Sequence, residues 1–304
     1  MKMNLMNRIS RTSLRIPAAV CALATFLVSG PALHAAGTLQ AYYSFEEGAG
    51  ATSADTTGNH GTAALVEDYA WSGVTPGALG HSTQSIDVQA NNAERGGAIL
   101  PGSVSTGVLE AGAFSVSLWA RSHRLLDGNP PGGSRVLLAK RNTGVGWPDA
   151  DWYYQIHQSD HDTGEMIGVD FGGNMDFPQT VTENAWHHYV FTHDGANSWT
   201  VFVDGAGSTM TTPNNPSNVG NDGWPLHVGW DGNGLNDAVA DPDTEIGKGK
   251  WHWNGEIDDL AIFSGELDQA QVDLLGAGGL VPEPSVSLLA VLSLGALLIR
   301  RRRG

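Results

Sequence analysis

Short stretches in which apolar and polar residues alternate fill most of the chain, and turn-forming residues separate them. The clearest is residues 114–120, where apolar residues alternate with serines, so one face of a strand is predicted to be buried. Clusters of Gly, Asn, Asp, Ser, Thr and Pro punctuate such stretches. Strands are predicted at residues 39–45, 114–120, 135–140, 152–157, 166–171, 186–193, 198–203, 226–230 and 256–263.

The sequence also predicts one hairpin and one short helix. Residues 186–193 and 198–203 flank Asp194-Gly195, a dipeptide typical of hairpin turns. Helical periodicity is confined to residues 268–275, which we expect to form one short helix. Many strands at close spacing with Gly-rich turns predict an all-β fold, a sandwich of two antiparallel sheets.

The N-terminal residues 1–36 have the order of a secretory signal peptide. Four basic residues come first, namely Lys2, Arg8, Arg11 and Arg15. An apolar run over residues 16–28 follows, and a small-residue cleavage site lies near Ala35 or Ala36. Cys21 does not fit a lipoprotein signal, because Val20 stands where such signals need a small residue.

The C-terminal residues 280–304 carry a second address signal. Pro282, Glu283 and Pro284 precede an apolar stretch at residues 286–299 and four arginines at residues 300–303. The stretch is short for a permanent span, which needs roughly 17–25 residues, and the arginines would stay on the cytoplasmic side. The segment resembles the PEP-CTERM sorting signal of Gram-negative bacteria, and this implies cleavage by an exosortase. A plain single-span membrane anchor is the alternative.

The segment between these ends, residues 37–279, has the length of one sandwich domain. It contains no cysteine once Cys21 is removed, so its core must form without disulfides. The whole chain has 16 Lys and Arg against 32 Asp and Glu. The two ends carry eight of the basic residues and one acidic residue, which leaves a net charge of −23. Such a domain repels nucleic acid and anionic lipid and suits divalent cations.

Four segments of this domain resemble the LamG-like jelly-roll domains of the concanavalin A-like lectin/glucanase superfamily. They follow one another in the family's order, at residues 42–65, 114–122, 186–205 and 255–275. Residues 127–162 follow the pattern less closely and are interpreted as an insertion. The resemblance implies a jelly-roll sandwich. It does not imply one function, because carbohydrate-binding modules, adhesion domains and domains attached to hydrolases share this fold.

The candidate catalytic motif of the chain is incomplete. Glycosidases with this sandwich fold carry carboxylates at alternating positions of one strand, and Glu256 and Asp258 resemble the start of that motif. Leu260 and Ala261 stand where the third carboxylate is expected, although a retaining hydrolase needs two carboxyl groups about 5–5.5 Å apart. Common serine-hydrolase, cysteine-nucleophile and zinc-protease patterns do not occur. We therefore expect no catalytic residues.

Calcium is the metal that the acidic composition favours. The polar loop at residues 55–61 offers Asp55, Asn59 and several carbonyl oxygens, and calcium takes six to eight oxygen ligands. Asp258 is expected to point inward with Leu260 and Ile262, since it shares their strand parity. In LamG-like domains the first and last strands are neighbours, which would bring Asp55 and Asp258 to one ion. Alternatively, Asp55 caps a turn and Asp258 accepts backbone N–H bonds.

Five tryptophans in or beside Gly- and Asp-rich loops are the candidate sugar contacts, because sugars stack on flat indole faces. They are Trp147, Trp152, Trp230, Trp251 and Trp253. A role in the core is the alternative for each of them, and Trp119 and Trp186 are expected to be core residues.

These residues favour a non-catalytic protein of the cell surface or extracellular matrix, with structural calcium and a polysaccharide or glycoconjugate as ligand. The two address signals place it outside a Gram-negative cell, anchored to the membrane at least transiently. Two alternatives stay open: a glycoside hydrolase or polysaccharide lyase of the same superfamily, and a purely structural surface component.

Overall fold

The computed structural model describes residues 37–88, 96–123, 134–141, 152–159, 166–170, 174–179, 181–196, 198–211, 224–230 and 253–279. All of them belong to one unit, Ala35–Gly304. The predicted signal peptide and the sorting tail with Pro282, Glu283 and Pro284 lie outside these ranges. No helix within the described ranges has the length and apolar character needed to cross a membrane.

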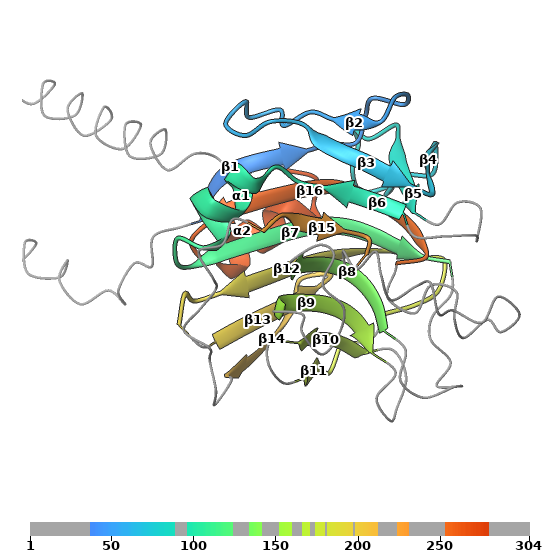
Figure 1. Ribbon diagram of the computed structural model, residues 1–304. Helices are drawn as coiled ribbons and strands as arrows, with labels where there is room; N and C mark the ends of the chain where they lie inside the picture. Colours follow the sequence, from blue (N-terminus) through green and yellow to red (C-terminus); the bar gives the residue numbers. More distant parts are fainter. Residues whose placement is uncertain are drawn as a thin grey trace, which may run out of the picture. The chain divides into compact units, whose positions relative to one another are not determined.

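The strands form two eight-stranded antiparallel sheets, as the alternating pattern predicts (Figure 1). Sheet A has the order β14-β13-β12-β7-β16-β5-β4, and β1 also pairs with β16. Its strands are β1 (Thr38–Tyr43), β4 (Tyr69–Ser72), β5 (Ser85–Val88), β7 (Phe114–Ser122), β12 (Trp186–His193), β13 (Ser198–Val203), β14 (Ala206–Thr211) and β16 (Gly255–Ser264). The pairing of β1 with β16 confirms that the first and last strands are neighbours.

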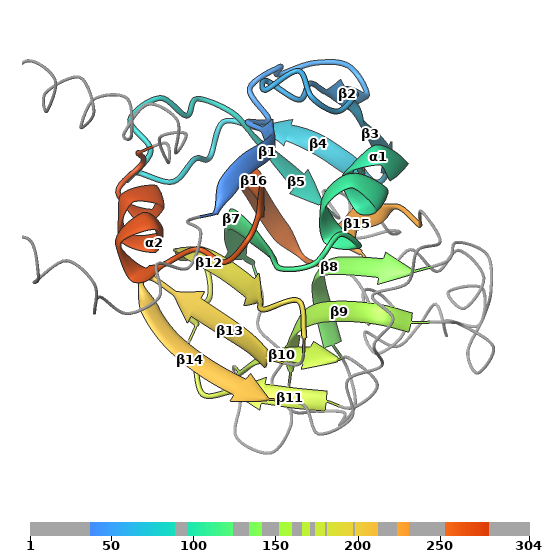
Figure 2. The same ribbon diagram turned by 90° about the vertical axis from the view of Figure 1, so that its left-hand side faces the viewer.

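Sheet B has the order β11-β10-β9-β8-β15-β6-β3-β2. Its strands are β2 (Thr52–Ser53), β3 (Ala63–Glu67), β6 (Gly96–Ile99), β8 (Ser134–Arg141), β9 (Trp152–Ser159), β10 (Met166–Asp170), β11 (Asn174–Phe177) and β15 (Leu226–Val228). A short helix α1 (Gly102–Val104) continues into the π-helical turn η2 (Ser105–Leu109), and α2 (Gln269–Gly276) follows the last strand. Figure 2 shows the two sheets as layers, with α2 against sheet A.

The main core lies between the sheets and follows from the alternation along β7. Val116, Leu118 and Ala120 point inward and are fully buried, together with apolar residues of sheet B such as Leu138 and Val228. The intervening residues of β7 point to the opposite side of the sheet. We call that side, which turns away from sheet B, the outer face of sheet A.

A second, smaller core lies on the outer face, under α2. Val190, Phe202 and Phe263 pack there against Val272 and Leu275 of the helix. The helix begins with a capping box, in which the Asp268 side chain accepts from the Gln271 backbone N–H and the Gln271 side chain accepts from that of Asp268. This confirms the helix predicted at residues 268–275.

A β-bulge in β16 changes the predicted direction of Asp258. The pairing of β16 with β7 shifts register between Asp258 and Ala261, and Asp259 has a left-handed φ of 48°. Ile257 and Leu260 both remain in the main core, with two residues between them instead of one. Strand parity predicted that Asp258 would point inward with Leu260, and this prediction is wrong because of the bulge. Asp258 lies opposite Trp119, on the outer face.

Candidate functional site on the outer face of sheet A

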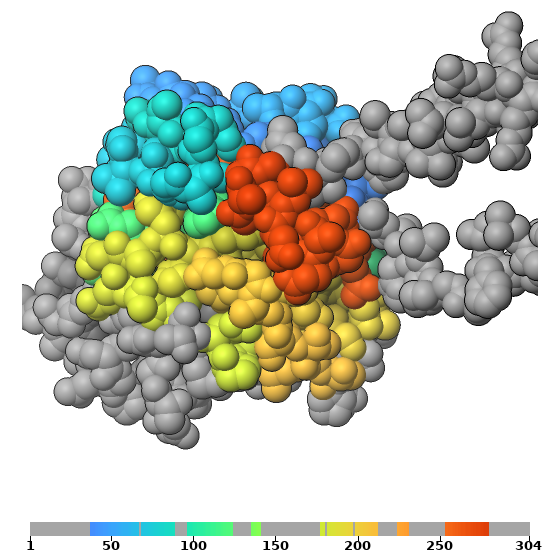
Figure 3. Space-filling view, turned by 180° about the vertical axis from the view of Figure 1, so that it is seen from behind, coloured from blue at the N-terminus to red at the C-terminus, as the bar shows by residue number. Residues whose placement is uncertain are grey.

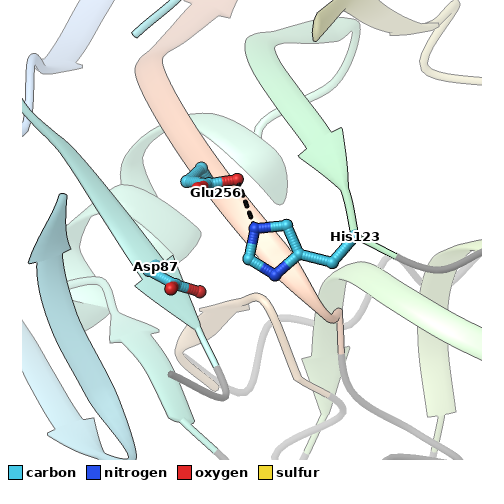
Figure 4. A group of neighbouring side chains, drawn as sticks. All are labelled: Asp87, His123 and Glu256. Carbon is cyan, nitrogen blue, oxygen red and sulfur yellow. Dashed lines mark hydrogen bonds and ion pairs between the residues drawn. The ribbon is translucent and has the colours of Figure 1, made fainter. Parts of the chain in front are cut away.

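Three adjacent strands place charged side chains in one row on the outer face. Asp87 of β5 is directly opposite Glu256 of β16, and Glu256 is directly opposite Arg121 of β7. Directly opposite residues of antiparallel strands point to the same side of the sheet. His123, just beyond the end of β7, completes this polar cluster of Asp87, Arg121, His123 and Glu256. Figure 4 shows Asp87, His123 and Glu256 gathered at the junction of the three strands.

Glu256 is the buried centre of the polar cluster and is held from two sides. Arg121 Nη1 donates to both of its carboxylate oxygens at 3.0 and 3.1 Å, and His123 Nε2 lies 2.8 Å from Oε2. Burial alone would raise the pKa of Glu256, but the contacts with His123 and Arg121 outweigh it and lower the pKa. The hydrogen bond to Glu256 raises the pKa of His123 in turn.

Asp87 has spare hydrogen-bonding capacity at the edge of the polar cluster. Its Oδ1 atom is buried without a hydrogen-bond partner, and burial raises the pKa of this carboxyl group. Among the described residues, Asp87, His123 and Glu256 are the only His, Cys, Asp or Glu trio whose ligand atoms all lie within 4.8 Å of one another. Because the Arg121 guanidinium already binds both oxygens of Glu256, this arrangement favours hydrogen bonding to a polar ligand over binding of a divalent cation.

The next row of the outer face contains Asp258, Trp119 and His188, which are opposite one another on β16, β7 and β12. The rings of Trp119 and His188 are 5.2 Å apart, and His188 Nε2 lies 2.8 Å from Ser117 Oγ. Trp119 was expected in the core. It is buried, but on the outer face, beside a titratable side chain.

Asp258 and Asp259 form an acidic pair on the bulge. Ser82 donates to Asp258 Oδ2 at 2.6 Å, and the Asp259 backbone N–H donates to Oδ1 at 2.9 Å. Burial raises the pKa of Asp258 to about 8 despite these donors, and it also raises the pKa of Asp259. Tyr42 donates its hydroxyl to Asp259, and His81 Nε2 lies 3.0 Å from the other oxygen.

The predicted calcium ligands have protein partners. Both oxygens of Asp55 accept hydrogen bonds, from Thr57, from the backbone N–H of Tyr42 at 3.0 Å and from that of His60 at 2.7 Å. These donors lower the pKa of Asp55 although burial opposes them. Asn59 donates its side-chain amide to the Gln40 carbonyl. Asp55 and Asp258 share no hydrogen-bond partner, and calcium binding by these residues stays a prediction.

The structure describes the side chains of two of the five candidate sugar-binding tryptophans. Trp253 is fully buried in the main core, where its ring meets Tyr189 edge-on at 6.3 Å, and Trp230 is buried beside His227. Their burial favours packing over sugar contact. Trp152 begins β9, but its side chain is not described, and Trp147 and Trp251 lie outside the described residues.

Sequence reasoning did not identify Asp87, Arg121, His123 or His188 as site residues. Strand parity along residues 114–122 could have placed Trp119 and Arg121 on one face together. The strand order that brings Asp87 and Glu256 beside them has no local signal.

Known proteins share this fold. Residues 96–273 match the family described as the concanavalin A-like lectin/glucanases superfamily. No curated protein matches the sequence. The solved structure of domain 4 of AbnA, an extracellular GH43 arabinanase from Geobacillus stearothermophilus, in complex with arabinotriose, is 20% identical. The match covers 80% of this chain and 100% of that domain with a TM-score of 0.53.

Two botulinum neurotoxin structures are also similar. The receptor-binding domain of the C/D mosaic serotype is 14% identical, with 79% of this chain and 51% of that chain covered and a TM-score of 0.52. A structure of type C, whose cell entry depends on interaction with two ganglioside molecules, is 12% identical, with 79% and 50% covered and a TM-score of 0.50. The chain thus spans about half the length of these toxin structures, and at such identities the likeness concerns the fold.

Proposed function

This chain belongs to the concanavalin A-like lectin/glucanase superfamily, and from that membership we propose that it is a non-catalytic, exported protein that binds carbohydrate. Two of the similar structures support the ligand class. One holds arabinotriose, and the other belongs to a toxin that interacts with gangliosides. The fold hosts enzymes as well, so the residues of the site must carry the argument.

The observation that carries the proposal is the polar cluster on the outer face. Sugar hydroxyl groups donate and accept hydrogen bonds, and the cluster offers both functions within a few ångströms. Arg121 and His123 are donors with side chains 21% and 36% exposed, and Asp87 is a half-buried acceptor whose buried Oδ1 has no hydrogen-bond partner. Buried Glu256 holds the two donors in place, which reduces the entropy that they lose on binding.

A glycan array with the purified protein, followed by titration calorimetry on its hits, tests the proposal. His123→Ala and Arg121→Ala are expected to weaken binding at least tenfold. The matched control is His60→Ala, which removes a half-buried histidine whose ring contacts Ser103 instead. Retained binding in both cluster variants would refute the cluster as the site, and no glycan binding at all would refute the function.

A hydrolase is the second candidate, because Glu256 and Asp258 both lie on the outer face with opposite pKa shifts. The pKa of Glu256 is lowered and that of Asp258 is raised to about 8, which resembles a division between a base and an acid. Glu256 is 2% exposed and Asp258 is fully buried, so neither is open to a polysaccharide. We therefore propose no catalysis. Release of reducing ends from polysaccharides, lost in Glu256→Gln, would reverse that choice.

We propose that residues 1–36 direct export and that residues 280–304 sort the protein to the cell envelope, with an exosortase-type enzyme as processing partner. The support is the order of residues in each segment: a basic start before an apolar run, and Pro282-Glu283-Pro284 before an apolar run and four arginines. Replacing Pro282, Glu283 and Pro284 by alanine is expected to leave unprocessed protein in the membrane fraction, detected by mass on immunoblots.

A further inference from the structure

A pocket on the outer face lies beyond the polar cluster, at the C-terminal end of α2. Its volume is about 340 Å³. Its lining comes from β7, β12, the turn after β13 and the helix: Trp119, His188, Asp204, Gly205, Val272, Asp273, Gly276 and Ala277. Figure 3 shows this face, where α2 (red-orange) lies over the strands of residues 186–211 (yellow to orange), with residues 69–88 (teal) on its other side.

His188 leaves a hydrogen-bonding atom without a partner at this pocket. Its side chain is almost fully buried, and Nε2 is used by Ser117, but Nδ1 has no hydrogen-bond partner. Burial lowers the pKa of His188 to about 4, so the ring is neutral at pH 7. An unpaired buried polar atom destabilises the folded protein, and a ligand that bonds to Nδ1 would offset part of that loss.

Gly276 lies directly against Nδ1, which is buried. A Cβ atom built at Gly276 would lie 3.2 Å from His188 Nδ1, in the space that a ligand atom needs. The glycine has no left-handed φ, so the helix end does not require it for conformation. A larger residue at position 276 would therefore press on the imidazole from the pocket side.

The lining indicates a neutral ligand rich in hydroxyl groups. Among its described residues the charged side chains are the carboxylates of Asp204 and Asp273, which disfavour an anion. Asp204 already accepts from His187 at 2.6 Å and from the His188 backbone N–H at 2.9 Å, and Asp273 accepts from Gln269. These donors offset the carboxylate charges and leave lone pairs for hydroxyl groups. A hydroxyl also satisfies Nδ1 in either tautomer, because it both donates and accepts, whereas an ammonium group only donates.

The size and apolar surface of the pocket limit the choice of ligand further. Its volume is at the low end of the roughly 300–1,000 Å³ range of small-molecule sites, which suits one sugar ring better than an oligosaccharide. Trp119, which is 8% exposed, provides apolar surface for the C–H face of such a ring. We infer that this pocket binds a single neutral sugar residue through His188 Nδ1, Asp204 and Trp119. The choice of a sugar as ligand rests on the proposed function, but the pocket is separate from the polar cluster.

Titration calorimetry with the full-length protein and a panel of neutral monosaccharides tests the inference. Gly276→Ala is expected to weaken monosaccharide binding at least tenfold, because its methyl group occupies the space beside Nδ1. The added Cβ lies 3.2 Å from His188 Nδ1, so the ring must shift slightly, while alanine is the better helix former. A melting temperature close to that of the original protein shows that the loss of binding is not a loss of folding. Gly77→Ala is the matched control, because a Cβ there meets nothing within 4 Å.

His123→Ala separates this inference from the proposed function. If it abolishes monosaccharide binding while Gly276→Ala does not, the sugar occupies the polar cluster, and the pocket is overturned while the function stands. If glycan-array binding fails but a monosaccharide binds and Gly276→Ala abolishes it, the pocket stands and the cluster does not. Choline binding that Gly276→Ala removes would overturn the sugar assignment in favour of a cation, and no binding by any probe would overturn the pocket.

Discussion

Buried polar side chains on the outer face show how neighbours decide the state of a titratable residue. Glu256 and Asp258 are two positions apart on β16, and both are almost fully buried. Glu256 has Arg121 and His123 beside it, and its pKa falls. Burial raises the pKa of Asp258, the donor Ser82 does not offset it, and the charges of Asp259 and Glu46 add to the rise. Cationic partners therefore decide which of the two carboxyl groups is ionised at neutral pH.

Asp258→Asn is expected to stabilise the protein increasingly as the pH rises. The folded-state pKa of about 8 exceeds the ordinary 3.8, so the contribution of Asp258 to stability is complete below about pH 4 and is lost as the pH rises towards 8. An asparagine side chain does not ionise, so the variant does not lose stability in this way as the pH rises. In urea denaturation with EDTA, the variant should gain on the order of 2 kcal/mol at pH 8 and almost nothing at pH 3. An equal difference at both pH values would contradict this, and exposed Glu47→Gln is the control.

At the scale of elements, the bulge in β16 and the helix α2 shape the outer face. The bulge turns Asp258 outward while Ile257 and Leu260 stay in the core. The helix covers the apolar half of the same face with Val272 and Leu275 and leaves the charged half open. The position of α2 therefore divides the outer face into a packed half and a half available to ligands.

Loss of the α2 capping box is expected to destabilise this cover. Asp268→Ala removes the acceptor for the Gln271 backbone N–H, which should cost about 1 kcal/mol of unfolding free energy. Thermal unfolding should show a fall of roughly 2–4 °C in a domain of this size. Asp268→Ser keeps a good N-cap and should remain close to the original protein. Equal losses in both variants would mean that the cap itself contributes little.

At the scale of the whole molecule, the two large sheets form the core without disulfides. Calcium could stabilise the protein in addition, at the loop of residues 55–60. The loop at residues 55–60 is tied to β1 by Asp55, whose oxygens accept from Tyr42, Thr57 and His60. Calcium at Asp55, Asn59 and Asp258 stays a prediction. The donors already present at the two carboxylates provide an alternative source of loop stability.

Thermal melts with calcium and with EDTA show whether Asp55 stabilises the loop as a calcium ligand or as a hydrogen-bond acceptor. If the ion binds the native state, it raises the melting temperature by mass action, and Asp55→Ala abolishes the rise. Because the protein donors occupy both oxygens, we expect Asp55→Ala to lower the melting temperature equally in both conditions, by about 4–8 °C for a loss near 2 kcal/mol. A fall seen only with calcium would establish the metal site.

The sequence by itself determined the fold class and many of its elements. Alternation at residues 114–120 and 186–193 predicted β7 and β12, the turn at Asp194-Gly195 predicted the hairpin to β13, and α2 followed from its periodicity. These features depend on neighbours within a few residues, so a single sequence carries them. Seven strands were not predicted, namely β2, β3, β4, β5, β6, β11 and β14.

Only the tertiary structure decided the composition of the site. Asp87, Arg121 and Glu256 come from distant parts of the chain, and they meet because β16 pairs with β5 on one side and β7 on the other. The bulge at Asp259 reversed the face of Asp258, and packing buried Trp253. Strand order, register shifts and burial depend on contacts between residues far apart in sequence, and local alternation carries no information about them.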